Sequence, residues 1–172
     1  MLDAALLRHL ERSGVEYCVI GGVALAVHGY GRYTADVDLL TMDARGLRRD
    51  FWPDELVAEI RTGAADDPLG GLVRCATSPP HDVLVGRGYA MRMAVATAEP
   101  HRELGAPVAT PLALVLLTLE AGGPQDRNDI VALVDAQRVL GTDRWVGDVP
   151  RHLARLSDAA RACWQRVSAD LT

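Results

Sequence analysis

The chain has 172 residues, of which 49% are hydrophobic and 24% charged, and this balance is typical of a soluble globular protein with one domain over residues 1–172. The net charge of −5 argues against strong non-specific binding to nucleic acid, and no apolar stretch approaches the ~20 residues that cross a bilayer. All 18 basic residues are arginine, which excludes every mechanism that needs a catalytic lysine.

The first forty residues predict two helices and two strands in alternation. Leucines at helical spacing between residues 2 and 10 precede Gly14, which is placed to end the first helix. Glu16–Ile20 is predicted to be a strand and Val23–His28 a short helix. A second strand is expected over Val37–Thr41, with its start at Asp36.

The middle of the chain mixes helical and strand patterns. Residues 44–61 are expected to be mostly helical, with an interruption at Trp52-Pro53, because proline disfavours helix in the residue before it. Leu72–Thr77 and His81–Val85 predict two further strands, and Glu99–Thr110 predicts another strand or a hairpin.

Beyond Pro111 the pattern is helical throughout. Leu112–Leu119 is nearly all apolar and predicts a central buried helix, while Asp126–Leu140 keeps its apolar residues on one side. A last apolar stripe runs at helical period from Val149 to Leu171. A mixed front half and a helical tail, without repeats or a linker, indicate an α+β domain whose helices gather at one end.

Cysteine usage and the N-terminal residues favour a cytoplasmic protein. The three cysteines are widely spaced and odd in number, which indicates reduced thiols rather than a disulfide framework. No basic segment precedes the first apolar residues, so the start of the sequence is a poor signal peptide.

Two carboxylates with one residue between them are the strongest chemical signal. Side chains alternate along a strand, so Asp36 and Asp38 are expected to share a face about 6.6 Å apart, a separation that can bracket a pair of metal ions. Their mutual repulsion favours a bound cation, and Mg²⁺ prefers carboxylate and phosphate oxygens. Asp82, at the head of an apolar strand, is the natural third acid.

A glycine pair precedes these acids. Gly21 and Gly22 stand between a predicted strand and a predicted helix, where bare backbone amides can approach a triphosphate. The pattern matches neither the dinucleotide-binding glycine fingerprint nor the P-loop. An Asp-x-Asp pair often merely caps a turn or a helix. The glycine pair and Asp82 together favour a metal-dependent site for nucleotides.

The string from Gly21-Gly22 to Asp36-Val37-Asp38 resembles the signature of the DNA polymerase β-like nucleotidyltransferase superfamily. With Arg32 and Thr34 added, it is similar to the branch that contains AbiEii-type toxins and lincosamide nucleotidyltransferases. The similarity covers residues 15–135. It implies a small mixed sheet of the nucleotidyltransferase fold over about 15–110, followed by helices over about 111–171.

The resemblance also implies roles for individual residues. Asp36 and Asp38 would bind two Mg²⁺ ions, and Asp82 would help to hold the second ion and orient or deprotonate the attacking hydroxyl. Gly21 and Gly22 would hold the triphosphate of a nucleotide.

Other positions near the motif are less typical. Arg32 and Thr34 flank the acidic strand and are candidate nucleotide-binding residues, although an ordinary loop ion pair is an equal alternative. Relatives of the AbiEii type usually carry a lysine where this chain has Thr118, and an arginine with no clear counterpart here.

The pattern therefore leads to two functional hypotheses. The first is a Mg²⁺-dependent enzyme that moves a nucleoside monophosphate from an NTP to a hydroxyl of a small molecule, a protein or an RNA end, in a toxin–antitoxin or resistance context. The alternative is a catalytically impaired binding or regulatory module of the same fold. The C-terminal stripe is mainly core, with room for a protein partner or a homodimer interface.

Overall fold

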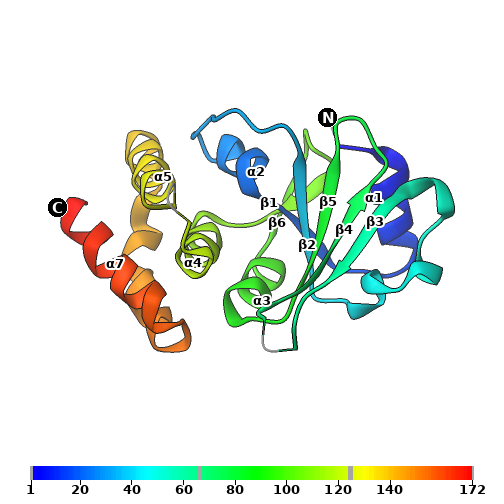
Figure 1. The fold of residues 1–172 in the computed structure, drawn as a ribbon. Helices are drawn as coiled ribbons and strands as arrows, with labels where there is room; N and C mark the ends of the chain where they lie inside the picture. The colour runs from blue at the N-terminus through cyan, green and yellow to red at the C-terminus, as the bar shows by residue number, and fades with distance from the viewer. Residues whose placement is uncertain (1, 66, 124–125, 172) are drawn as a thin grey trace.

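A computed structural model describes residues 2–65, 67–123 and 126–171 (Figure 1). Its strands form one seven-stranded mixed sheet in the order β3-β4-β5-β2-β1-β7-β6. The strands are β1 (Tyr17–Ile20), β2 (Val37–Thr41), β3 (Val57–Thr62), β4 (Leu69–Cys75), β5 (His81–Gly86), β6 (Glu99–His101) and β7 (Ala106–Val108). The α-helices are α1 (Ala4–Arg12), α2 (Gly21–Val27), α3 (Tyr89–Ala96), α4 (Pro111–Ala121), α5 (Asp126–Leu140), α6 (Val149–His152) and α7 (Asp158–Asp170).

The sheet centre is β2, which runs antiparallel to β1 and parallel to β5. Every residue of β1 is buried, as expected of an apolar strand in the middle of a sheet. In the β2–β5 pair Asp38 lies directly opposite Asp82, and Leu40 lies opposite Leu84. The parallel register therefore brings two acids that are far apart in the sequence to the same level of the sheet.

Helices separate the sheet from the C-terminal end of the chain. Helices α2 and α3 pack on β1 and β2, and α4 packs on α3, α5 and α7, so that α4 lies between the sheet and the last helices (Figure 1). This central position explains why α4 is apolar on most sides, with Leu114, Leu116 and Leu119 buried. Thr110 caps its start, and Gly122, with a φ of 65°, ends it.

The α+β class, the mixed sheet and the helical C-terminal end are as predicted. The helix over Asp126–Leu140 is confirmed within the described residues, and Glu99–Thr110 contains the expected hairpin of β6 and β7. Strand β2 begins at Val37, one residue later than expected. The part of the chain that the structure describes contains no helix with the length and apolarity needed to cross a membrane.

Three local features differ from the sequence-based expectations. Residues 44–61 form short 3₁₀ turns (Ala44–Leu47, Arg49–Phe51 and Asp54–Leu56) and the start of β3 instead of a helix. Trp52 is buried there, with its indole N–H donating to the Gly46 carbonyl at 2.7 Å, and β3 gains its hydrogen bonds by pairing with β4. Helix α3 was not expected. The C-terminal stripe is broken into α6, 3₁₀ turns and α7, which starts anew at the cap Ser157.

Candidate active site

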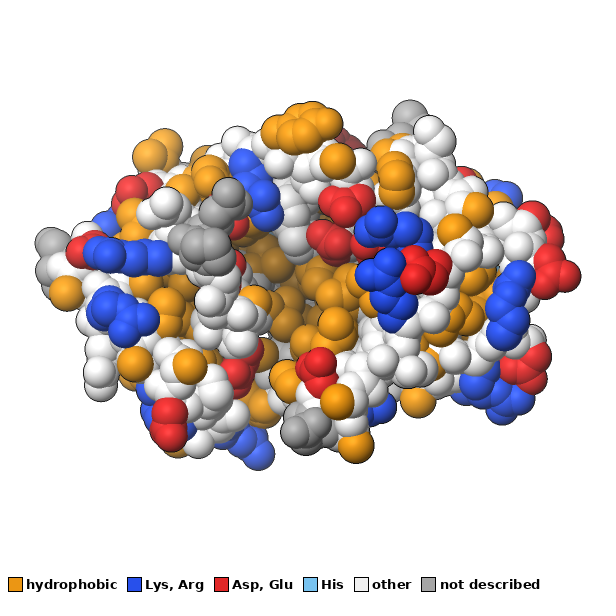
Figure 2. Space-filling model, in the orientation of Figure 1, with side chains coloured by type: hydrophobic (Ala, Val, Ile, Leu, Met, Phe, Trp, Pro, Cys, Tyr) orange, Lys and Arg blue, Asp and Glu red, His pale blue; other side chains and the backbone are white. Residues whose placement is uncertain are grey.

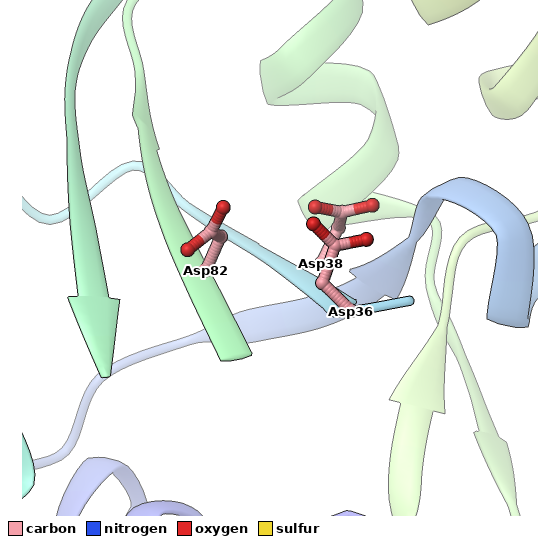
Figure 3. Close-up of side chains that lie close together, drawn as sticks. All are labelled: Asp36, Asp38 and Asp82. Carbon is pink, nitrogen blue, oxygen red and sulfur yellow. The ribbon is translucent and has the colours of Figure 1, made fainter. Parts of the chain in front are cut away.

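Three carboxylates converge at one end of the β2–β5 pair (Figure 3). Asp38 comes from β2 and Asp82 from β5, while Asp36 lies in the turn just before β2. Each offers one oxygen, and these oxygens lie within 4.8 Å of one another. The predicted grouping of Asp36, Asp38 and Asp82 is thus present, although Asp36 reaches it from a turn and not from the strand. Such a set of hard oxygen donors fits a divalent cation.

Asp38 lies in the middle of this cluster. Burial, then repulsion from Asp36 and Asp82, raises the pKa of Asp38 to about 6, against the opposing effect of two nearby arginines. Without a cation, the ionised form of Asp38 is therefore destabilised by its surroundings. A bound metal ion would remove that destabilisation.

The two glycines make room for the side chains of the site. Gly21 has a φ of 63°, and a Cβ on it would lie 2.2 Å from Asp38 Oδ2. A Cβ on Gly22 would lie 2.8 Å from Cβ of Thr34. The glycine pair is therefore required for the close approach of Asp38 and Thr34 to the start of α2, a role that sequence reasoning missed.

Thr34 is oriented toward Asp36. Its hydroxyl lies 3.0 Å from the carbonyl oxygen of Asp36 and 3.2 Å from Asp36 Oδ1, and it can donate to either. Expected as a nucleotide-binding residue, Thr34 here orients the first acid of the cluster.

Arg74 is a member of the site that sequence reasoning did not identify. It lies opposite Asp82 in the antiparallel β4–β5 pair, and its guanidinium binds both oxygens of that carboxylate, at 2.8 and 2.6 Å. The pair raises the pKa of Arg74 above its ordinary value. Its pairing with Asp82 depends on the register of the β4–β5 pair, which the positions of the two predicted strands do not fix.

A second ion pair connects the loop after α2 with α5. Arg32 Nε lies 3.4 Å from Asp129 Oδ2, and the Tyr30 hydroxyl donates to Asp129 Oδ1 at 3.2 Å. A cavity of about 160 Å³ opens beside this pair, lined by Gly21, Arg32, Thr118 and Asp129 among others. Arg32 thus faces a hollow next to the acid cluster while it is paired with α5.

Two histidines lie close in sequence to the glycine pair and to Asp82, and both are held by hydrogen bonds to the backbone. His28 shares a 2.8 Å hydrogen bond with the Ala109 carbonyl. His81 is buried, accepts from the Asp3 backbone N–H at 3.1 Å and contacts the Pro79 carbonyl at 2.9 Å. Burial lowers the pKa of both imidazoles.

No protein-family model matches the sequence, and no curated protein matches it either. The fold is similar to that of the antibiotic-resistance factor ANT(2'')-Ia, with a TM-score of 0.51 and 16% identity over 96% of this chain and 90% of that one. The chain has a nucleotidyltransferase fold. An antigenic nucleotidyltransferase-like protein from Paracoccidioides brasiliensis also matches, with a TM-score of 0.44 and 16% identity over 92% and 89% of the two chains.

Within this nucleotidyltransferase fold, Thr118 lies on α4 and lines the cavity beside Gly21 and Arg32. Its hydroxyl donates to the Leu114 carbonyl at 2.8 Å. The two arginines that most affect Asp38, Arg32 and Arg74, are each paired with a carboxylate. Arg32 and Arg74 are therefore the arginines whose charge acts on the acid cluster.

Proposed function

We propose that the chain is a divalent-metal-dependent nucleotidyltransferase that moves a nucleoside monophosphate from an NTP to a hydroxyl acceptor. The observation that carries the proposal is the set of three carboxylates with oxygens within 4.8 Å of one another, at the glycine turn of a nucleotidyltransferase fold. The acceptor oxygen forms a bond to the α-phosphorus, the bond from that phosphorus to the bridging oxygen breaks, and pyrophosphate leaves with the electron pair.

Asp36 and Asp38 would hold Mg²⁺, with Asp82 as a third ligand for a second ion. Bound there, the ions would neutralise charge on the phosphate oxygens and align the attacking and leaving groups. The raised pKa of Asp38 supports this assignment, since a carboxylate destabilised by its neighbours gains most from a cation. Thr34 would keep Asp36 in its binding orientation.

Asp82 would accept the proton of the attacking hydroxyl or orient that hydroxyl. Its side chain is only 6% exposed, and Arg74 binds both of its oxygens. Arg74 therefore holds the Asp82 carboxylate in a fixed orientation in the absence of substrate. Since the Arg74 side chain is 47% exposed, it has room to move toward a phosphate oxygen when metal takes its place on Asp82.

Gly21 and Gly22 would present backbone amides at the start of α2 to the triphosphate, because the first N–H groups of a helix have no partner within it. Arg32 would supply positive charge at the neighbouring cavity, which Thr118 also lines. The resemblance to AbiEii-type toxins leads us to expect a lysine at the position of Thr118. In this assignment the glycines have two tasks, to admit Asp38 and Thr34 and to leave the backbone open to phosphate.

One observation favours a second candidate function. Arg74 occupies both oxygens of Asp82, and Thr118 supplies no charge, so the fold could bind a nucleotide without transferring it. Such a protein would be a regulatory module, for example one half of a toxin–antitoxin pair that contacts its partner through the C-terminal helices. Nucleotide binding without pyrophosphate release in any acceptor screen would favour this candidate.

Calorimetric titration of ATP, GTP, CTP and UTP, with and without Mg²⁺, tests the proposal. Binding should require Mg²⁺ and should vanish in Asp38→Asn. Asp54→Asn is the matched control, because Asp54 is an exposed acid paired with Arg49 far from the cluster in the sheet order. Failure of the well-folded wild-type protein to bind any of the four nucleotides would refute the proposed function.

A further inference from the structure

A second, larger hollow adjoins the cavity that Gly21 lines. A cavity of about 360 Å³ is enclosed by the end of β5, the start of α3 and the last turn of α4. It shares Leu117 and Ala121 of α4 with the smaller cavity beside Gly21, so both belong to one cleft. Figure 2 shows a hollow between the two sides of the molecule, with a hydrophobic floor and charged side chains on its rim.

The larger cavity begins next to Asp82. Leu84 lines it and lies two residues after Asp82 on β5, so the two side chains share a face of the sheet and are about 6.8 Å apart along the strand. The smaller cavity begins at Gly21, which touches Asp38. The larger cavity is therefore next to Asp82 and the smaller one next to Asp38, so one cleft can hold an acceptor at one acid and a nucleotide at the other.

The lining of the larger cavity indicates what it can hold. Leu69, Leu84, Met91 and Leu117 contribute partly exposed apolar side chains from four different elements. The Tyr89 hydroxyl shares a 2.7 Å hydrogen bond with Nδ1 of His152, and the Arg155 guanidinium lies over the Tyr89 ring. These contacts hold the Tyr89 side of the cavity in place. A volume of this size is at the lower end of the range of small-molecule sites.

The charges around the cavity restrict the kind of compound that it can bind. The described lining residues include two carboxylates, Asp67 and Glu120, and no basic side chain. A phosphate or carboxylate on the occupant would be repelled there. A nucleic-acid strand needs free cations along its path, whereas Arg32 and Arg74 are both paired.

We infer that this cavity, lined by Leu84 and Leu117, is the acceptor site, and that the acceptor is a compact, largely apolar hydroxyl compound without phosphate or carboxylate groups. Its apolar body lies on Leu84 and Met91, and its hydroxyl points along β5 to Asp82. The inference rests on the proposed function, because it assigns the acceptor of that same reaction. It selects a small molecule over a protein side chain or an RNA end.

The test uses methyl NMR spectra of the whole protein with two matched probes, 2-(4-hydroxyphenyl)ethanol and 4-hydroxyphenylacetate. The alcohol should shift the methyl signals of Leu84, Leu117 and Met91 with roughly millimolar affinity, as expected for a ligand of this size, and the acid should bind at least about tenfold more weakly. Leu84→Phe and, separately, Leu69→Phe should fill the cavity and weaken alcohol binding about tenfold. Leu140→Phe, at an exposed position of α5, is the matched control and should change nothing.

Equal binding of the two probes, or saturable shifts that exclude these three residues, would overturn the inference, as would no shifts at all. The wild-type spectra decide the matter even if a filling variant fails to fold. Mg²⁺-dependent NTP binding is measured on the same samples. If the wild-type protein binds no NTP, the proposed function is refuted. If it binds NTP but not the alcohol, only the acceptor assignment is refuted.

Discussion

Arg74 on β4 forms a two-pronged ion pair with Asp82 on β5, through Nε to Oδ1 at 2.8 Å and Nη2 to Oδ2 at 2.6 Å. The carboxylate is buried and the guanidinium is half exposed. The third acid of the cluster is therefore neutralised from the solvent side. This arrangement lets three carboxylates lie together in a protein without metal, and it links the stability of the site to its chemistry.

Removal of this guanidinium should destabilise the metal-free protein. Arg74→Ala leaves Asp82 buried without its partner and beside two other acids, and we expect a clear loss in the free energy of unfolding that exceeds the loss in the control below. Urea denaturation in EDTA measures this loss. Arg61→Ala, which breaks an exposed pair with Glu59 on β3, is the control and should change the free energy of unfolding little. Equal effects of the two substitutions would contradict the role of Arg74.

Asp38→Asn should stabilise the metal-free protein at neutral pH. The folded-state pKa of Asp38 is about 6 against an ordinary value of 3.8, so its contribution to stability is fully present below about pH 4 and is lost as the pH rises through about 6. The variant removes this ionisation, and we expect a gain of up to about 2 kcal/mol at pH 7.5 that disappears near pH 4. Unfolding curves in EDTA across this range test the sign. A loss of stability at pH 7.5 would be the opposite of the expectation.

The same shift predicts how metal binding depends on pH. Mg²⁺ and protons compete for Asp38, so thermal stabilisation by Mg²⁺ with a non-hydrolysable NTP analogue should be large above pH 7 and should fall as the pH drops through about 6. Thermal unfolding at a fixed Mg²⁺ concentration gives the profile. A stabilisation that is flat between about pH 5 and pH 8 would show that Asp38 is not the titrating ligand.

Gly21→Ala should abolish the site. The added Cβ would meet Asp38 Oδ2 at 2.2 Å, and the φ of 63° is unfavourable for alanine. Gly14→Ala is a close control, since Gly14 has a φ of 65° with no atom within 4 Å of its would-be Cβ. We expect Gly14→Ala to cost about 1 kcal/mol from the backbone alone. Gly21→Ala should cost more and should also remove Mg²⁺-dependent nucleotide binding, and comparable behaviour of the two variants would argue against a steric role.

Thr34→Val should weaken metal binding without unfolding the protein. Valine keeps the methyl group that packs against Gly22 and removes the hydroxyl that orients Asp36. Loss of a hydrogen bond to a metal ligand typically lowers affinity about 10- to 100-fold. Thr34→Ser keeps the hydroxyl and should retain most of the affinity. Calorimetry of Mg²⁺ and NTP binding compares the two, and similar affinities would exclude the positioning role.

The sequence alone was sufficient for the parts of the fold with strong local patterns. Residue spacing alone predicts the apolar strands before and after the glycine pair and the acid pair. It also predicts the helix over Asp126–Leu140, whose apolar residues lie on one side. Asp82 was found because an acid that begins an apolar strand stands out. These features depend on few residues that are close together in the chain.

The remaining features depend on contacts that spacing does not reveal. Strand β3 exists because β4 supplies its hydrogen bonds, and its exposed residues at an edge gave no strand pattern. Helix α3 is short and only Ala90 and Ala94 of it are buried, so its sequence has no apolar stripe that would predict a helix. The pairing of Arg74 with Asp82 and the approach of Asp38 to Gly21 follow from strand register, which is known only when the sheet is assembled.

The central claim is that Asp36, Asp38 and Asp82 bind divalent metal together with a nucleotide. Electron paramagnetic resonance of Mn²⁺, titrated into the protein with a non-hydrolysable NTP analogue, tests it most directly. We expect two Mn²⁺ ions to bind per chain, and only when the analogue is present. This binding should be lost in Asp38→Asn and kept in Asp54→Asn. Mn²⁺ binding no greater than that of the free analogue, or binding unchanged by Asp38→Asn, would contradict it.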